Sequence, residues 1–506
     1  MVKKSYIYKT FVFILILSSI NVKQISFSAE DKKIEKKIQL SLKYCIEEAL
    51  INNLEFQYDQ FDPKITKLGI QKIYDENSFI IGFQPSLRQG IKPVSNTSLS
   101  GINLLNEISQ SYDFFTKKKL FSGGEISFNF ENSLFSTNSP RYEINPSITP
   151  KIYTSFFQPL LKQGFVFEKK LIIAKNINKI SNYKIRKKAS DLVLRIQNIY
   201  WNIISTQERL KVLENSLVLA KELLNVNIEK QKAGFLAKID VLTTEANIAS
   251  KKEGILQVQR DLEIYKYNLK RLINLKYDYN YDIELTDKPV FQDFTFNIKD
   301  NYENAINKRF DYQISLIELN IEETNLLLAE KNKLPALNFN GNLGLESLSN
   351  DYLKSLGSLF SFQNYFWNLG LSLELPIGDN IAQTNYQENL LTLEQNKKSL
   401  EGLKQNIFFD IKQAILDFEI NKQRIEANKI AKELAFEQLK AETEKLNLGL
   451  STNFQVLQYQ KSYEEAGLNQ VNSIIDYIKS INSVYDKSGI LLEKNNIFSN
   501  ELDNTQ

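Results

Sequence analysis

Two very long stretches of the chain contain no proline, and this feature constrains the fold more than any other. None of the ten prolines falls within 160–288 or 377–506. Since proline is the strongest breaker of helix interiors, both stretches can hold uninterrupted helices. We predict a hairpin of two long antiparallel helices in 166–275 and another in 381–490. A helix over 166–232 would be roughly 100 Å long at about 1.5 Å per residue, so it must pack sideways on partners.

The two predicted hairpins repeat each other. Apolar residues along the first helix, from Ile196 onwards, keep the alternating three-and-four spacing of a coiled-coil seam. One offset of 215 positions (449 − 234) relates four pairs across the hairpins: Gly234 with Gly449, Val241 with Val456, Leu242 with Leu457 and Ile196 with Ile411. A register kept over this distance indicates a duplicated unit.

Both turns carry signals that end one helix and begin the next. Glycine tolerates the left-handed backbone conformation that ends many helices, so we expect Gly234 and Gly449 at the two turns. Thr452 and Gln455 have the spacing of a capping box for the following helix. Asp240 falls in the first turn of its helix, where a negative charge is favoured.

Strand patterns precede each hairpin. Apolar and polar residues alternate with period two, most clearly in 367–375, where every odd residue is large and apolar. We predict two core strands in each half, four per chain, and leave open an extra hairpin near 117–131. The strands are expected in about 79–87, 126–131, 337–345 and 367–375, with loops in about 93–119, 132–150 and 346–364 and a helix before each set of strands, in 41–75 and 302–333.

The start of the chain predicts an exported protein. Residues 1–28 have the pattern of a secretory signal, with Lys3, Lys4 and Lys9 before an apolar run too short to span a bilayer. The alternative is an uncleaved anchor helix. Without the four lysines of this segment, 59 basic residues (63 − 4) stand against 60 acidic ones. This balance gives no electrostatic footprint for nucleic acid, so we expect no nucleic-acid partner.

The composition removes the common forms of catalysis. The chain has no histidine, which rules out the usual general base, the Ser-His-Asp triad and His-bearing metal sites. The only cysteine, Cys45, cannot form an intramolecular disulfide, and we expect it at a buried apolar position. We predict no catalytic residue, no metal site and no cofactor, so the protein is not expected to be an enzyme.

The predicted strands have an apolar face but no core of their own, because they lie between long helices. One alternative is an ordinary sandwich, half-buried on a core. If the apolar face contacts lipid instead, open sheet edges are not tolerated. Four strands cannot close a membrane barrel, since the smallest have about eight. Three chains would supply twelve strands (3 × 4), so closure would require oligomerisation.

This layout resembles the outer-membrane efflux protein family, the TolC-like trimeric channels. The resemblance covers about 40–490 and is carried by the opening Leu42, Ile46, Ala49 and Asn53, the phrase Gln158-Pro-Leu160, the segment Ile199-Tyr-Trp201 and the two Gly-x(6)-Val-Leu turns. It implies an α+β membrane protein, a homotrimer with a 12-stranded barrel in outer-membrane lipid and a long α-helical barrel in the periplasm. The implied function is a passive channel of a tripartite efflux or type I secretion system. The implied partners are a periplasmic adaptor and an inner-membrane pump.

The resemblance also assigns roles to both turns, for which the alternative is a plain connection between helices. They match the periplasmic tips where adaptors dock in the family, at Gly234, Phe235, Leu236, Asp240, Leu242, Gly449, Leu450, Ser451, Val456 and Leu457. Well-known members carry acidic residues around the pore entrance in the second tip, whereas this chain has Gln455 and Gln458 there. We take these two glutamines and Asp240 as candidates for a pore constriction.

The expected organisation has five segments. They are a signal peptide 1–28, a first repeat 29–275, a connector 276–300, a second repeat 301–492 and a disordered tail 493–506. The main alternative function is an exported periplasmic coiled-coil adaptor or structural protein, which usually has one hairpin flanked by compact β-domains. Drug efflux and protein secretion share the channel architecture, so the sequence does not select the cargo.

Overall fold

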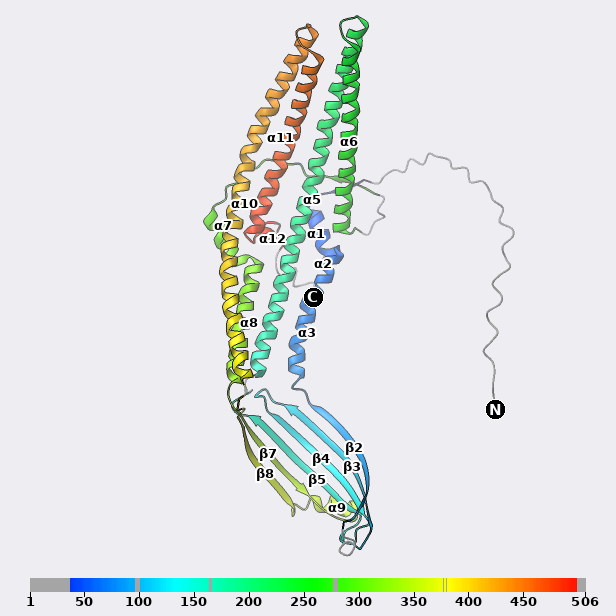
Figure 1. Ribbon diagram of the computed structural model, residues 1–506, viewed down its shortest axis with the longest axis vertical. Helices are drawn as coiled ribbons and strands as arrows, with labels where there is room; N and C mark the ends of the chain where they lie inside the picture. Colours follow the sequence, from blue (N-terminus) through cyan, green and yellow to red (C-terminus); the bar gives the residue numbers. More distant parts are fainter. Residues whose placement is uncertain are drawn as a thin grey trace, which may run out of the picture.

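The computed structural model is an elongated molecule with a β-sheet at one end and two helical hairpins that reach to the other end (Figure 1). It describes residues 37–95, 101–162, 166–275, 281–375, 377–378 and 380–497. The predicted signal peptide lies outside these residues. No helix in the described ranges combines the length and the apolar composition that crossing a membrane requires.

The order of elements recurs in the two halves: short helices, strands and then a long helical hairpin. The first half contains β1 (Lys37–Leu40), α1 (Leu42–Asn52), α2 (Leu54–Asp59), α3 (Phe61–Asp75), β2 (Ile80–Pro93), β3 (Leu104–Lys119), β4 (Glu125–Thr137), β5 (Ser147–Pro159), α5 (Val166–Lys232) and α6 (Lys238–Ile273). The second contains β6 (Asp282–Leu285), α7 (Ile298–Lys308), α8 (Phe310–Asn332), β7 (Ala336–Glu346), α9 (Tyr352–Leu359), β8 (Tyr365–Glu374), α10 (Ile381–Asn447), α11 (Asn453–Lys487) and α12 (Leu491–Lys494).

Both long hairpins form as predicted. α5 begins and ends at the residues that the proline-free pattern indicated, and α10 has the same length of 67 residues. Gly234 and Gly449 both adopt the left-handed conformation, with φ of 81° and 79°. These two glycines therefore end their helices in the way that the sequence indicated.

The second helix of each hairpin also begins as predicted. The Thr452 hydroxyl accepts a hydrogen bond from the Gln455 amide (3.3 Å) and caps α11. Asp240 lies in the first turn of α6. Local sequence signals are thus sufficient to start and stop these helices.

Equivalent positions of the two repeats lie in separate apolar cores. Ile196 of α5 is fully buried in the larger core, together with residues of β1, α1, α6 and β6. Ile411 of α10 is buried in a second core with residues of α7, α8 and α11. Cys45 is buried in the larger core, as predicted. Burial and, to a smaller extent, the charge of Asp287 raise the pKa of its thiol to about 12.

The helix predicted before each set of strands is interrupted, and the two interruptions are equivalent. Asn53 separates α1 from α2, and Arg309 separates α7 from α8; both have an extended backbone. The Asn53 side chain accepts from the Phe56 amide and donates to the Leu272 carbonyl, each at 2.9 Å. The prediction of one continuous helix over 41–75 was wrong, because a cap and a distant contact favour a break that apolar periodicity does not show.

The second repeat continues past its predicted end at residue 492. α12 covers residues 491–494, and Leu491, Leu492 and Ile497 are buried in the larger core. The prediction that a disordered tail starts at 493 was therefore wrong for the first five of its residues, because apolar side chains hold this segment on the helices. Residues 498–506 lie outside the described residues.

One antiparallel sheet contains six strands in the order β2-β3-β4-β5-β7-β8. The α+β class is confirmed, but the expected count of four strands was wrong. β3 lies in 93–119, which we expected to be a loop. Its polar residues Asn106 and Gln110 share a face with Ile108, which weakens the alternation in the sequence. The extra hairpin left open at 117–131 is the turn between β3 and β4, and α9 occupies part of the expected loop 346–364.

Candidate functional site

The sheet carries large apolar side chains on one of its faces. The register aligns Phe83, Phe114 and Phe130 across three strands, so their side chains share this face. The rings of Phe83 and Phe114 stack with centroids 4.5 Å apart. The apolar face continues to β8, where Trp367 is 64% exposed. Other exposed members are Ile81, Leu87, Ile91, Leu343, Leu369 and Leu371.

The opposite face carries charged and polar side chains. Lys92 pairs with Glu107 across β2 and β3 (3.0 Å), and Lys151 pairs with Glu346 across β5 and β7 (3.1 Å). β7 contributes three amide side chains to this face: Asn338, Asn340 and Asn342. Outward apolar and inward polar residues alternate along the strands of membrane barrels, so the apolar face suits lipid and the polar face suits water.

The sheet of one chain has two open edges, formed by β2 and β8. β2 has 14 residues and β8 has 10. Because all six strands alternate in direction, the two edge strands run antiparallel to each other. The β8 edge of one copy can therefore pair in antiparallel fashion with the β2 edge of another copy.

The first helical tip exposes apolar side chains at the far end of the molecule (Figure 1). Phe235 beside Gly234 is 84% exposed, and Leu242 is 47% exposed. Leu236 is half-buried and Asp240 is half-buried. Ile239, which the sequence reasoning missed, is exposed as well.

The second tip also presents apolar side chains, with one exception among the predicted residues. Leu450, next to Gly449, is 75% exposed. Val456 is fully buried in a small core between the hairpins, and Leu457 packs against that core. Val456 is therefore removed from the surface predicted for docking, because its side chain is not accessible. Exposed residues that the sequence reasoning missed are Leu448 and Phe454.

The remaining predicted tip residues are polar. The hydroxyl of Ser451 donates to the Glu442 carboxylate (2.5 Å), which fixes the second turn on α10. Gln455 and Gln458 are exposed on the first turns of α11. Their role in a constriction, with Asp240, stays a prediction.

A buried set of polar groups joins the two tips. The amide of Asn227 in α5 donates to the hydroxyl of Thr244 in α6 (2.9 Å) and to the side-chain oxygen of Asn453 in α11 (2.7 Å). The amide of Asn453 donates to the Asp240 carbonyl (3.1 Å). Since buried polar groups are costly when unpaired, these bonds fix how the hairpins meet.

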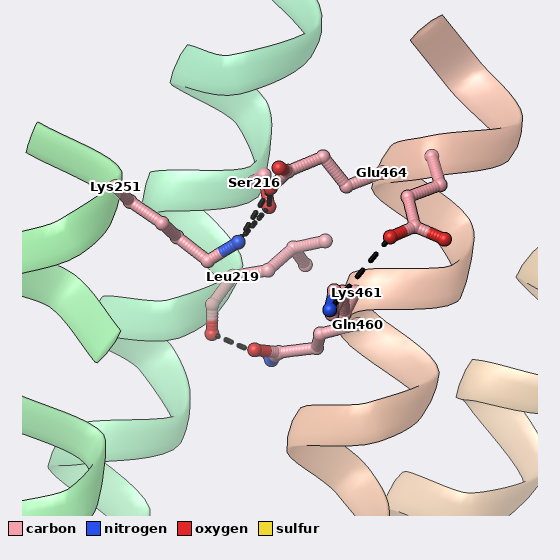
Figure 2. A network of polar contacts seen from close by, with 7 residues as sticks. Ser216, Leu219, Lys251, Gln460, Lys461 and Glu464 are labelled. Atoms are coloured by element: carbon pink, nitrogen blue, oxygen red, sulfur yellow. Dashed lines mark hydrogen bonds and ion pairs between the residues drawn. The ribbon is translucent and has the colours of Figure 1, made fainter. Parts of the chain in front are cut away.

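A second polar contact joins the hairpins farther along the helices. Figure 2 shows Lys251 of α6 and Glu464 of α11 meeting at Ser216 of α5. The Lys251 ammonium lies 2.5 Å from the Glu464 carboxylate and 2.7 Å from the Ser216 hydroxyl. The Gln460 amide donates to the Leu219 carbonyl (3.1 Å) beside them. The lysine side chain is only 9% exposed, so this ion pair is largely shielded from water.

The described residues contain no group of three or more His, Cys, Asp or Glu side chains placed to hold a metal ion. The two candidate functional features are therefore surfaces. One is the sheet, with an apolar and a polar face, and the other is the pair of apolar helical tips at the opposite end of the molecule. Neither surface gathers groups for covalent chemistry.

Comparisons with known proteins agree with this architecture. Residues 301–486 match the model of the outer membrane efflux protein family. A comparison with curated proteins finds no match. Among solved structures, the outer-membrane channel OprN is similar with a TM-score of 0.68 at 14% identity, covering 88% of this chain and 89% of OprN. The CmeC outer membrane channel of Campylobacter jejuni is similar with a TM-score of 0.65 at 17% identity, covering 94% of each chain.

The chain thus has the same fold as these two outer-membrane channels. The match to the outer membrane efflux protein family lies within the second repeat of the chain, at residues 301–486.

Proposed function

We propose that three copies of the chain close into one passive channel that crosses the outer membrane and the periplasm. The observation that carries this proposal is the six-stranded sheet, which has an apolar face, a polar face and two open edges. Such edges are not tolerated in lipid, so the sheet has to close with other copies. Three copies is the number that the resemblance to TolC-like channels implies.

The barrel of this trimer would be larger than the sequence suggested. Six strands per chain give eighteen in three copies (3 × 6), in place of the twelve that four strands would give. Barrels of about 16–18 strands leave an aqueous channel. The polar face, with its cross-strand ion pairs, would line this channel.

The mass of the detergent-solubilised protein tests the closure. Light scattering corrected for the micelle should give the mass of three chains, each of 58.6 kDa minus its signal peptide. Recordings in planar bilayers should show single channels. A monomer or dimer that stays in solution without detergent would overturn the proposal, because it would make the apolar face part of an ordinary soluble surface.

We further propose that the helical tips dock a periplasmic adaptor that connects the channel to an inner-membrane pump, as in a tripartite efflux or type I secretion system. Five exposed apolar residues at the tips support this: Phe235, Ile239, Leu448, Leu450 and Phe454. Exposed apolar clusters rimmed by polar residues are typical of protein-binding surfaces. Polar contacts between the hairpins hold the tips in a fixed arrangement, which suits rigid docking.

Two substitutions test the docking surface. The double variant Phe235→Ser/Leu450→Ser should raise ethidium accumulation in cells that carry it as their only copy, while the trimer mass and conductance stay unchanged. Lys238→Ser is the matched control, since it changes an exposed polar residue of the same tip. Unchanged ethidium accumulation in the double variant would argue against docking at the tips when the parent chain exports this dye. If the parent exports a different cargo, the same comparison is made with that cargo.

A further inference from the structure

One row of residues on the polar face of the sheet alternates between bulky and small side chains. The register links direct partners across all six strands. From β2 to β8 the row reads Gly82, Phe115, Asn129, Tyr153, Gly344 and Phe366. Three aromatic rings thus lie in one row of the face that carries the ion pairs and the amides, where Phe135 and Phe157 are further aromatic residues.

The two glycines of this row leave the space that the rings fill. A Cβ atom on Gly82 would lie 2.2 Å from Cζ and 2.5 Å from Cε1 of Phe115. A Cβ atom on Gly344 would lie 2.7 Å from Cζ of Phe366 and 2.4 Å from Cβ of Tyr153. The Phe115 ring therefore lies across Gly82, and the Phe366 ring reaches over Gly344. The Tyr153 and Phe366 rings are 6.1 Å apart between centroids.

We propose that Gly82 and Gly344 hold these aromatic rings flat against the wall of the channel and so set its width along this row. The inference rests on the proposed closure of the sheet with its polar face inside. In a closed trimer the row contributes nine rings (3 × 3), each of which would narrow the lumen if it stood upright. Glycine is the only residue without a Cβ, so only glycine leaves room for a ring to lie on the strand.

Gly82 is the better position for a test. At Gly344 an added Cβ would also meet the Ile152 carbonyl at 2.7 Å, so a substitution would disturb the backbone of the sheet. At Gly82 the three nearest atoms all belong to the tip of the Phe115 ring, which can turn away. Asp113 and Lys117 flank Phe115 on the same face of β3. The displaced ring therefore has to move towards the lumen.

The experiment compares single-channel conductance and polymer exclusion in planar bilayers. Gly82→Ala should lower the conductance, and smaller polyethylene glycols than in the parent should be excluded from the pore. Gly82→Ala/Phe115→Ala should return both values to the parent level or above it, because the displaced ring is gone. Phe115→Ala alone should change the conductance less than Gly82→Ala does, since a flat ring occupies little of the lumen.

Three outcomes would overturn the inference. The first is a Gly82→Ala variant that forms a trimer of the correct mass and has the same conductance as the parent. The second is a loss that the double variant does not reverse. The third, which needs no substitution at Gly82, is a large gain of conductance in Phe115→Ala, because it would mean that the ring already stands upright. A parent protein that forms no channel would instead refute the proposed function, and this inference with it.

Discussion

The two longest helices, α5 and α10, share one length and one sequence plan but have different surroundings. α5 contacts α3, α6, α8 and α11 and runs through the middle of the molecule, whereas α10 contacts α7, α8 and α11 at one side (Figure 1). Apart from Ile381 at the start of α10, four large apolar residues of this helix stay more than half exposed: Leu391, Phe409, Leu416 and Leu434. These positions are separated by 18, 7 and 18 residues (409 − 391, 416 − 409 and 434 − 416). Since such spacings are close to whole turns, the four side chains share one face.

The difference shows that the two copies of the duplicated unit do not bury their apolar residues to the same extent. The seam of α5 is buried or half-buried by other elements of the same chain. The exposed stripe of α10 needs a partner that one chain does not supply. A neighbouring copy in the proposed trimer would cover it. Apolar residues therefore stabilise the fold of the single chain at α5, whereas at α10 they would stabilise the association of chains in the proposed trimer.

The largest effect should come from a core residue of α5. Ile196→Ala removes a fully buried side chain and should lower the free energy of unfolding by about 2–5 kcal/mol. Leu416→Ala on α10 should change the stability of the chain little but favour dissociation of the trimer. Urea unfolding followed by circular dichroism, with light scattering on dilution, separates the two effects. The comparison fails if Leu416→Ala destabilises the chain as strongly as Ile196→Ala and leaves the trimer intact.

The next effect concerns the ion pair that links the hairpins. Lys251→Met leaves the Glu464 carboxylate, 18% exposed, without its cation and should cost about 1–3 kcal/mol. Lys251→Met/Glu464→Met should recover part of this loss, because no shielded carboxylate is left without a cation, although the Ser216 hydroxyl loses both partners. Urea midpoints of the three proteins give the measurement.

A matched control for this pair lies close to it on α11. Lys461 and Glu465 are 3.9 Å apart with side chains 68% and 61% exposed (Figure 2 shows Lys461). Lys461→Met should therefore cost at most about 1 kcal/mol, since water screens exposed pairs. Equal losses for Lys251→Met and Lys461→Met would show that shielding of the pair does not matter.

The equivalent helix breaks at Asn53 and Arg309 should differ in their response to pH. Arg309 donates to Asp311 at 3.1 and 2.7 Å and to Asp410 at 3.0 Å. Burial alone would raise the pKa of Asp311, but the hydrogen bonds and charge of Arg309 outweigh it, and this pKa is lowered. A lowered folded-state pKa adds stability above the ordinary value near 3.8, and this stability is lost as the pH falls through the lowered pKa.

The two breaks can be compared by substitution. Arg309→Met should reduce stability at pH 7 and flatten its decline below about pH 4, since Arg309 then no longer opposes the effect of burial on the pKa of Asp311. Asn53→Ala should cost about 0.5–2 kcal/mol at every pH, because it removes a neutral cap. Urea midpoints at pH 7, 4 and 3 test both. A steeper acid response in Arg309→Met than in the parent would contradict this account.

The smallest effect on stability is expected at the second tip. Gln455→Asp adds one carboxylate per chain at the candidate constriction, so divalent cations should block the single-channel current more strongly. Stability should change by no more than about 0.5 kcal/mol, because the residue is exposed. Gln455→Asn is the neutral control. Equal block in both variants would remove Gln455 from the pore-lining residues.

The sequence predicts the parts of the fold that depend on local signals. The absence of proline, the turn glycines and the Thr452 cap are all properties of neighbouring residues, so the bounds of α5 and both tips follow from them. The period-two pattern likewise predicts β8 and its apolar face. These signals involve residues within one turn of a helix or one pair of neighbouring residues, so they can be recognised in a single sequence.

Only the tertiary structure decides the features whose partners are far apart in the chain. Strand β3 has a polar interruption on its apolar face and forms because β2 and β4 complete its hydrogen bonds on both sides. Asn53 breaks a helix in part through the Leu272 carbonyl, 219 positions away. The burial of Val456 and the pairing of Lys251 with Glu464 depend on how two hairpins pack. The energy of packing comes from contacts between residues that are far apart in the chain. No local pattern connects such residues, so the sequence alone does not reveal these contacts.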